Sequence, residues 1–227
     1  MIVAEDVTKD YIDGETVVHA LRGVSLQVNQ GEFISIAGPS GSGKSTLLNI
    51  IGCIDTASGG RVHIDEEEVT GHAPRELTLL RRRKIGFVFQ SFNLIPVLTA
   101  YENVAFSLML LGLEDSEAEP RVRAILEEVG LAGMEDRLPA KLSGGQQQRV
   151  AVARALVKEP TIVLADEPTA NLDSDTGQSI LELMRELNRR RETTFIFSTH
   201  DRMVMDFADR LALLHDGRIV EDNRRTA

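Results

Sequence analysis

The sequence predicts an α/β fold with a mostly parallel core sheet, a β-rich N-terminal part and an inserted all-helical subdomain. Short apolar runs alternate with turns up to about residue 90 and return after residue 159. Between them, apolar residues recur at three- and four-residue spacing, which is typical of helices. Strands that alternate with helices favour a parallel sheet. We therefore expect a single domain over residues 1–227, with a core of about 1–90 and 159–227 and a helical subdomain of about 91–158.

The expected strands are short runs rich in apolar and β-branched residues. They are Ile2–Val7, Val24–Val28, Phe33–Ala37, Arg61–Ile64, Ile85–Phe89, Thr161–Ala165, Thr194–Ser198 and Leu211–Leu214. The expected helices of the middle part are Ala100–Leu113, Glu119–Val129 and Gln147–Val157, and a later one spans about Thr176–Arg190. Two basic runs, Arg81–Lys84 and Arg189–Arg191, are each expected to end a helix, because cations favour helix C-termini.

The composition of the chain limits the classes of protein to which it can belong. With 42% hydrophobic and 26% charged residues the chain should be globular. We expect it to be soluble, because there is no N-terminal apolar signal and the longest nearly apolar stretch, around Val104–Leu113, is too short to span a bilayer. A net charge of −10 argues against broad nucleic-acid binding. The single cysteine, Cys53, lies in an apolar run, so we expect it to be buried and reduced.

A phosphate-binding loop is the first functional motif. Gly38, Gly43, Lys44 and Ser45 meet the pattern G-x-x-x-x-G-K-[ST] between an expected strand and an expected helix. Backbone N–H groups and the helix N-terminus would form an anion site. Lys44 would contact the β- and γ-phosphates, and the Ser45 hydroxyl would bind Mg²⁺. The residues expected to bind nucleotide here are Gly38, Pro39, Ser40, Gly41, Ser42, Gly43, Lys44, Ser45 and Thr46.

Two carboxylates form the second motif. Asp166 and Glu167 directly follow the apolar run Ile162–Ala165. Ligands of a parallel sheet bind at the carboxyl ends of its strands. Asp166 is therefore expected to hold Mg²⁺, and Glu167 to polarise a water for in-line attack on the γ-phosphate. The alternative is that both acids cap the following turn.

The third motif is Leu142-Ser143-Gly144-Gly145-Gln146. Two glycines allow amides to approach an anion closely, and a helix expected to start near Gln146 would aim its positive end at that anion. With the phosphate loop and the two carboxylates, this motif makes the chain resemble the ATP-binding cassette (ABC) ATPases over essentially its whole length. Their order and spacing are similar to those of a single uninterrupted cassette.

The resemblance implies roles for further residues. Tyr11 resembles the aromatic residue that stacks on adenine, and His200 resembles the histidine that contacts the γ-phosphate. Gln90 resembles the glutamine that reaches Mg²⁺ and the attacking water. Asp173 belongs to a loop, Asn171-Leu172-Asp173, that would cross a dimer.

The resemblance also implies a second copy of the chain. Ser143, Gly144 and Gly145, with Gln146 beside them, would contact the γ-phosphate that the other copy holds. Two ATP molecules would then be buried in a two-fold interface. ATP would close the dimer and hydrolysis would open it.

In the family this cycle powers an integral-membrane permease, so we expect the chain to be cytoplasmic and peripheral on the inner face of the cell membrane. Segments such as Gly52–Asp55 and Leu164–Asp173 resemble the lipoprotein-releasing and macrolide or antimicrobial-peptide efflux group. Partners in that group are few-span permeases with large extracytoplasmic domains. Ala57 and Ala170 depart from the group, which often has proline and glycine there. The apolar segment Ser91–Thr99 is either a docking surface for the permease or ordinary core packing.

Two other functions are known for cassette ATPases. Cassette ATPases of DNA repair and chromosome maintenance carry long coiled coils between the phosphate loop and the signature motif, and this chain has no room for them. The alternative that stays open is a soluble ABC ATPase that regulates a membrane or assembly complex without transport.

Overall fold

The computed structural model describes residues 1–14 and 16–224, which form two compact units. The first unit combines Met1–Arg81 with the segment that begins at Thr194, and the second is Arg82–Thr193. Helix α2 (Pro74–Lys84) contains the point at which the chain passes from the first unit to the second. No helix among the described residues is both long enough and apolar enough to cross a bilayer.

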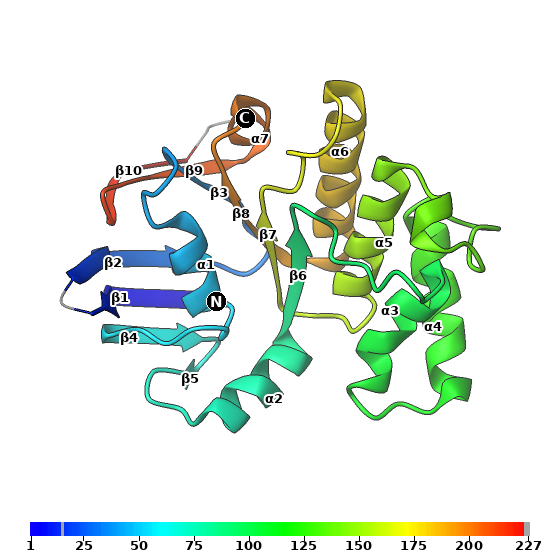
Figure 1. The fold of residues 1–227 in the computed structure, drawn as a ribbon, viewed down its shortest axis with the longest axis horizontal. Coiled ribbons are helices and arrows are strands. Elements are labelled where there is room, and N and C mark those ends of the chain that lie inside the picture. The colour runs from blue at the N-terminus through cyan, green and yellow to red at the C-terminus, as the bar shows by residue number, and fades with distance from the viewer. Residues whose placement is uncertain (15, 225–227) are drawn as a thin grey trace. The chain divides into compact units, whose positions relative to one another are not determined.

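One sheet of the first unit is antiparallel. Its strand order is β2 (Thr16–Val28), β1 (Ile2–Asp13), β4 (Gly59–Ile64) and β5 (Glu67–Glu68), as Figure 1 shows. The β1–β2 hairpin is longer than the sequence predicted. Its outer half, including Thr16–His19, is exposed on both faces and therefore shows no alternation of apolar residues.

The first unit also contains parallel strands. Strand β3 (Phe33–Ala37) lies between β8 (Thr194–Thr199) and β9 (Arg210–His215), parallel to both, and β10 (Arg218–Arg224) pairs antiparallel with β9. All residues of β3 and β8 are buried, as expected for parallel strands that are covered on both faces. Phe33 packs against Phe197 with ring centroids 4.6 Å apart. Helices α1 (Lys44–Ile51) and α7 (Arg202–Phe207) complete this unit.

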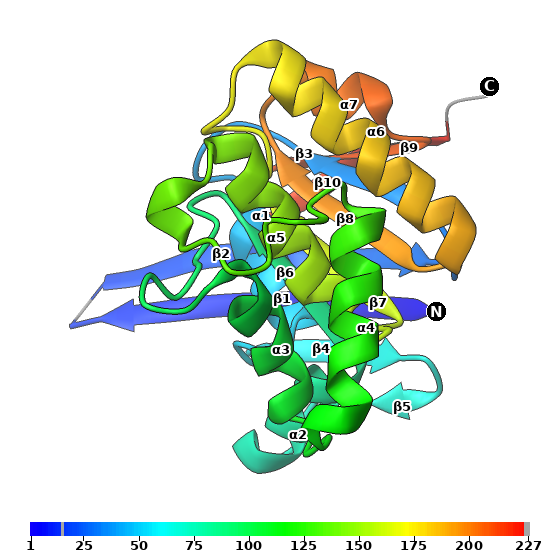
Figure 2. The same cartoon turned by 90° about the vertical axis from the view of Figure 1, so that its right-hand side faces the viewer.

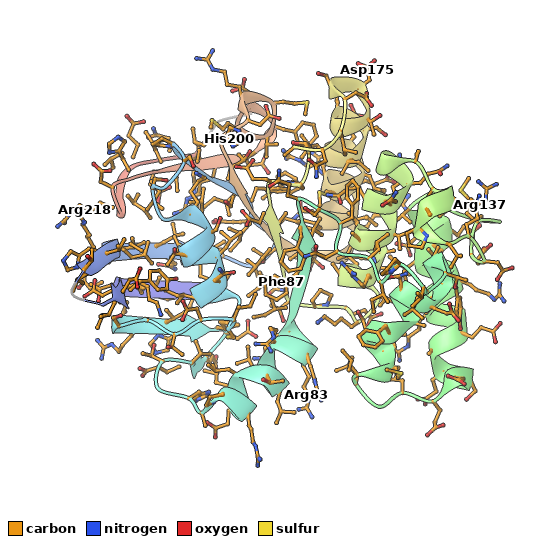
Figure 3. All side chains as sticks on the ribbon, in the orientation of Figure 1. Arg83, Phe87, Arg137, Asp175, His200 and Arg218 are labelled. Atoms are coloured by element: carbon orange, nitrogen blue, oxygen red, sulfur yellow. The ribbon has the colours of Figure 1, made fainter. Side chains whose placement is uncertain are left out.

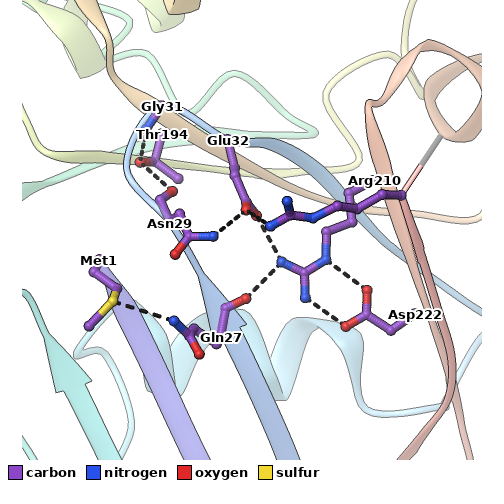
Figure 4. Close-up of polar contacts among 9 residues, drawn as sticks. Met1, Gln27, Asn29, Gly31, Glu32, Thr194, Arg210 and Asp222 are labelled. Atoms are coloured by element: carbon purple, nitrogen blue, oxygen red, sulfur yellow. Dashed lines mark hydrogen bonds and ion pairs between the residues drawn. The ribbon is translucent and has the colours of Figure 1, made fainter. Parts of the chain in front are cut away.

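A group of charged side chains connects the β9–β10 hairpin to the start of β3 (Figure 4). Arg210 donates to Asp222 at 2.6 and 2.7 Å, and to Glu32 and the Gln27 carbonyl at 2.8 and 2.7 Å. Arg224 donates to the other oxygen of Glu32 at 2.7 Å. The Arg210 side chain is only 12% exposed, so water screens these pairs less than it screens ordinary surface pairs.

The second unit combines two parallel strands with a group of helices. Strands β6 (Ile85–Phe89) and β7 (Ile162–Asp166) pair in register from Ile85 opposite Ile162 to Phe89 opposite Asp166. Helix α5 (Gly144–Leu156) packs against β6, and Gly86 gives it room, because a Cβ there would lie 2.7 Å from the Ala155 carbonyl oxygen. Figure 2 shows the other α-helices of the unit, which are α3 (Ala100–Met109), α4 (Asp115–Glu128) and α6 (Ser174–Arg191). A short 3₁₀ turn, η1 (Pro139–Lys141), precedes α5.

Several expectations about elements are confirmed and some boundaries are wrong. The basic runs do end α2 and α6, and Cys53 is 2% exposed. The signature helix begins at Gly144 and not near Gln146, because Ser143 caps it. Helix α3 ends at Met109 and not at Leu113, since the chain turns at Gly112 with φ of 82°. The expected helical subdomain, residues 91–158, lies within the second unit, and its status as a subdomain stays a prediction.

Candidate nucleotide-binding and catalytic site

The phosphate loop links β3 to α1 in the first unit. Gly38 and Gly43 have φ values of 154° and 103°. A Cβ on Gly38 would lie 2.1 Å from the Leu214 carbonyl oxygen, and a Cβ on Gly43 would lie 2.5 Å from the Ala20 carbonyl oxygen. No other residue fits either position, which explains both glycines of the motif.

The turn between β9 and β10 contacts this loop through backbone hydrogen bonds. The Gly217 N–H donates to the Ser42 carbonyl at 3.0 Å, and the Gly217 carbonyl accepts from Arg22 N–H at 2.8 Å. Leu214, which limits the space at Gly38, belongs to the same hairpin. The hydrogen bonds of Arg210 to Asp222 and Glu32 therefore fix the β9–β10 hairpin, which in turn contacts the phosphate loop.

Two side chains of the loop are donors from which a bound anion would accept. Lys44 is 7% exposed, and its ammonium donates to the carbonyls of Gly38 and Pro39, each at 2.8 Å. The Ser42 hydroxyl is buried and has no hydrogen-bond partner among the described residues. Phosphate oxygens would accept from both groups, and a charge-assisted bond would be stronger than those that Lys44 makes with carbonyls.

Two other predicted residues lie in the first unit. His200 directly follows β8 and is exposed, and Figure 3 labels it near the start of α7, where Asp201 caps the helix by accepting from Met203 N–H at 2.9 Å. Tyr11 lies on β1, is 40% exposed and donates its hydroxyl proton to Asp55 at 2.9 Å. The sequence did not point to Asp55 as a partner of Tyr11.

In the second unit Asp166 ends β7 and Glu167 directly follows it, and both are half-buried. Glu167 has φ of 48°, a left-handed conformation that is uncommon for this residue type and costs free energy. The fully buried Gln148 of α5 donates to the carbonyl of the next residue, Pro168, at 2.6 Å. This bond holds the turn that directs Glu167, and it ties that turn to the signature helix.

Gln90 lies close to the two carboxylates. It directly follows β6, whose last residue, Phe89, is opposite Asp166 in the parallel register. The Gln90 carbonyl accepts from the Asn171 side chain at 3.0 Å, so the loop that contains Asp173 is connected to this corner. The structure thus brings Gln90, Asp166 and Glu167 to one end of the β6–β7 pair.

The signature motif forms the N-terminus of α5. Ser143 and Gln146 make a capping box, in which the Ser143 hydroxyl accepts from Gln146 N–H at 3.3 Å and the Gln146 side chain accepts from Ser143 N–H at 3.0 Å. Gly145 is needed because a Cβ there would lie 2.6 Å from the Thr176 methyl carbon. The N-terminus of α5, which is the positive end of the helix dipole, therefore lies in a closely packed turn.

Asp173 has a local role that the sequence reasoning missed. It caps α6 by accepting from the backbone N–H and the hydroxyl of Thr176 at 2.9 and 2.7 Å. These hydrogen bonds lower the pKa of Asp173. The pattern Asp173-x-x-Thr176 before an apolar helix was the signal that could have revealed this cap.

The apolar segment Ser91–Thr99 is held by buried polar groups. The Asn103 side chain, fully buried on α3, accepts from Ile95 N–H at 2.8 Å and donates to the carbonyls of Ile95, Leu98 and Thr99. Arg154 of α5 donates to the carbonyls of Phe92 and Asn93. Within the segment Val97 is 78% exposed, whereas Leu94, Ile95 and Leu98 are half-buried.

The predicted site residues thus fall into two groups. The first unit brings together Tyr11, the loop Gly38–Thr46 and His200. The second unit holds Gln90, Ser143, Gly144, Gly145, Gln146, Asp166, Glu167 and Asp173. Their individual roles in binding and catalysis stay predictions.

Comparison with known proteins adds independent findings. The sequence pattern that defines the ABC transporter family matches residues 21–170. An ABC transporter ATP-binding protein of Methanocaldococcus jannaschii, MJ0796, is 48% identical over 228 residues, which covers 99% of this chain and 97% of the relative. The macrolide export ATP-binding/permease protein MacB of Brucella melitensis is 46% identical over 225 residues, and the chain spans only 35% of that longer relative.

Solved structures agree with the sequence matches. The chain is similar over its full length to MJ0796 in a dimeric post-hydrolysis state bound to ADP and Pi, with a TM-score of 0.91 and 45% identity. A second dimeric MJ0796 structure gives the same TM-score at 46% identity. These likenesses confirm the predicted fold class.

Proposed function

This chain belongs to the ABC transporter family, and we propose that it is the ATP-hydrolysing subunit of a transporter, in which the closure of two copies on ATP drives a membrane permease. The observation that carries the proposal is the phosphate loop, where a buried Ser42 hydroxyl lacks a partner among the described residues and the Lys44 ammonium is held beside it. The whole-length likeness to a cassette bound to ADP and Pi supports the same chemistry.

We assign the phosphate contacts to groups of the first unit. Lys44 would exchange its two carbonyl partners for the β- and γ-phosphates, and Ser42 would donate to a phosphate oxygen. Backbone N–H groups of Gly38–Thr46 and the N-terminus of α1 would complete the anion site. His200 is proposed to contact the γ-phosphate, and Tyr11 to stack on adenine.

We propose that Mg²⁺ binds together with the nucleotide. Ser45, Asp166 and Gln90 would hold the ion, which would neutralise charge on the β- and γ-phosphates. No cluster of three or more His, Cys, Asp or Glu side chains that could hold a metal occurs in residues 1–14 and 16–224.

Glu167 is proposed to act as the general base. It would accept a proton from a water as that water attacks the γ-phosphate in line. The left-handed backbone conformation of Glu167 and the hydrogen bond from Gln148 to the Pro168 carbonyl fix the direction in which the Glu167 side chain leaves the backbone. The Glu167→Gln variant would keep the side chain's shape but could no longer take the proton.

The second copy would complete each site. The turn Ser143–Gln146 places the positive end of α5 at the surface, and we propose that it contacts the γ-phosphate held by the partner copy. Asp173 would lie in the same interface. The dimeric structures of the similar cassette MJ0796 support this arrangement.

We propose that the permease binds at α3 and α4. A groove of about 810 Å³ lies there, with an apolar lining that includes Leu98, Phe106 and Met109. The lining also includes one basic residue, Arg123, and five acidic residues, Glu102, Asp115, Glu119, Glu135 and Asp136. A cytoplasmic permease helix with an apolar face and basic ends would match this groove. The chain would then be peripheral on the inner face of the membrane.

The transported molecule is proposed from relatives alone. MacB is described as a macrolide exporter, and the finer sequence resemblance is to the group that exports such compounds or releases lipoproteins and peptides. We therefore propose export or lipoprotein release. The second candidate, regulation of a membrane complex without transport, would use the same ATP chemistry.

Two experiments test the proposal. Calorimetric titration with ATP should show that Lys44→Ala lowers affinity strongly, and unchanged affinity would refute the assignment of the phosphate loop. Tagged Glu167→Gln, purified with ATP from detergent-solubilised membranes, should recover a few-span permease with a large extracytoplasmic domain. If mass spectrometry found only soluble proteins, regulation of an assembly complex would replace transport.

A further inference from the structure

We propose that Asp55 is a positioning residue for the nucleotide base. It holds the Tyr11 ring by accepting from the Tyr11 hydroxyl, and helix α1 fixes the position of Asp55, and so of the ring, with respect to the phosphate loop. The inference rests on the proposed function, because it assumes that Tyr11 stacks on the base. Nothing in the sequence motifs assigns a role to Asp55 beyond its place in Gly52–Asp55. All the groups involved lie in the first unit.

Both carboxylate oxygens of Asp55 are engaged. Oδ2 accepts from the Tyr11 hydroxyl at 2.9 Å. Oδ1 accepts from the Lys9 ammonium at 2.6 Å and from Thr56 N–H at 2.7 Å. A carboxylate held by two donors on one oxygen presents the other oxygen in a fixed direction, so the phenol has one preferred position.

Lys9 makes the arrangement rigid. Its side chain is 11% exposed, and besides Asp55 its ammonium donates to the Thr56 carbonyl at 2.8 Å. The same ammonium lies 4.9 Å from the centre of the Tyr11 ring, close enough for a cation–π contact. Burial raises the pKa of Asp55, but the hydrogen bonds from Lys9, Tyr11 and Thr56 outweigh it and lower that pKa, so the carboxylate is charged at neutral pH.

Helix α1 connects Asp55 to the phosphate loop. The N–H groups of Ile54 and Asp55 both donate to the Asn49 carbonyl near the end of α1, at 2.8 and 3.1 Å. The Cys53 carbonyl accepts from Arg81 at 2.6 Å, which fixes the same turn from α2. The N-terminus of α1 carries the phosphate loop, so one helix, about 12 Å long, spaces the phosphate site from the anchor of the aromatic ring.

A second link joins Tyr11 to the loop itself. Thr46, the residue that follows Ser45, acts on the same phenol: it opposes the rise in the pKa of Tyr11 that burial and Asp55 cause. A ring that is fixed before the nucleotide arrives loses less conformational entropy on binding, which favours stacking. Asp55 should therefore contribute to affinity for the base and contribute nothing to affinity for the phosphates.

The test separates the base from the phosphates. Calorimetry in the presence of Mg²⁺ would compare ATP with inorganic tripolyphosphate, which has no base, for the full chain and for Tyr11→Phe, Asp55→Asn and the double variant. One net hydrogen bond corresponds to a loss of about three- to tenfold in ATP affinity for each single variant. The double variant should lose no more than Tyr11→Phe, because that change already removes the hydroxyl through which Asp55 acts on the ring. Affinity for tripolyphosphate should not change.

Asp10→Asn is the matched control. Asp10 is on the same strand and loses the same charge, but it pairs with His19 at 2.7 Å and does not contact Tyr11. It should bind ATP normally. Tyr11→Phe keeps the ring and lies at the surface, so it reports on the tether even if Asp55→Asn folds poorly.

Three results would overturn the inference. ATP affinity that is unchanged in Tyr11→Phe would show that the tether has no effect. Losses that add in the double variant, or a parallel loss of tripolyphosphate affinity, would show that Asp55 acts only on the general structure. If the unmodified chain bound neither ATP nor tripolyphosphate, the proposed function would fail first, and this inference with it.

Discussion

Replacing Asn103 with leucine should loosen the segment Ser91–Thr99. The two side chains are similar in size, so the change removes hydrogen bonds and leaves no large cavity. Asn103 is fully buried and is bonded to the N–H of Ile95 and to the carbonyls of Ile95, Leu98 and Thr99. Leucine can make none of these bonds.

The expected cost follows from which groups lose a partner. The Ile95 carbonyl would still accept from Leu98 N–H at 3.1 Å, and the Thr99 carbonyl would still accept from the residue 103 N–H at 2.9 Å. The Ile95 N–H and the Leu98 carbonyl lose the bonds that Asn103 makes. Each such group costs about 1–3 kcal/mol when it is buried, and the lower end applies because the segment is half exposed. We expect a total loss of about 2 kcal/mol in the free energy of unfolding.

Two assays measure the effect. Urea unfolding followed by circular dichroism should give the loss in stability. Hydrogen exchange should show the Ile95 amide exchanging about 30-fold faster, which is the same free energy if exchange occurs through local opening of the segment. Ser107→Ala on the same helix is the control, because its hydroxyl donates only to the Arg154 carbonyl at 3.1 Å, and it should leave Ile95 exchange unchanged. If Asn103→Leu matched the control in both assays, these hydrogen bonds would not hold the segment.

Three further predictions concern other parts of the chain. Ser143→Arg should preserve ATP binding by the monomer but prevent the ATP-dependent dimer in size-exclusion chromatography with Glu167→Gln, and a dimer of normal stability would refute the role given to Ser143. Gly38→Ala should lower ATP affinity at least about tenfold, since its Cβ would lie 2.1 Å from the Leu214 carbonyl oxygen, and calorimetry showing normal affinity would contradict the steric argument. Burial raises the pKa of the Cys53 thiol to about 11, whereas an unfolded chain ionises it near pH 8.5. The free energy of unfolding should therefore fall as pH rises from about 9 towards 11, and should fall less in Cys53→Ala; equal slopes for both proteins in urea titrations would contradict this.

The sequence predicted the parts of the site whose residues are adjacent in the chain. Gly38, Gly43 and Lys44 lie where β3 leads into α1, as their spacing predicted, and phosphate binding at this turn stays a prediction. The comparisons confirm the fold class and the family that these motifs indicated. Strands such as β3 and β6 were predicted with correct bounds because they are short, apolar and bounded by turns.

The residues that support the site were not predictable in this way. Asp55, Asn103 and Gln148 are polar residues whose partners lie far away in the sequence or in irregular loops. Their side chains alone do not distinguish a buried anchor from a solvated surface group. The exposed strand β10 was missed for the opposite reason, because a strand with almost no buried face has no alternation to detect.

The support of the phosphate loop by the β9–β10 turn has a consequence for biosynthesis. The loop Gly38–Thr46 leaves the ribosome early, whereas Leu214 and Gly217, which shape and hold it, are added only after the whole second unit has been translated. A nascent chain therefore carries the complete motif for a long time without the backbone contacts that fix its shape. Nucleotide binding would begin only when the C-terminal hairpin closes, so a ribosome that stops before Gly217 would release a chain unable to compete for ATP or for a partner copy.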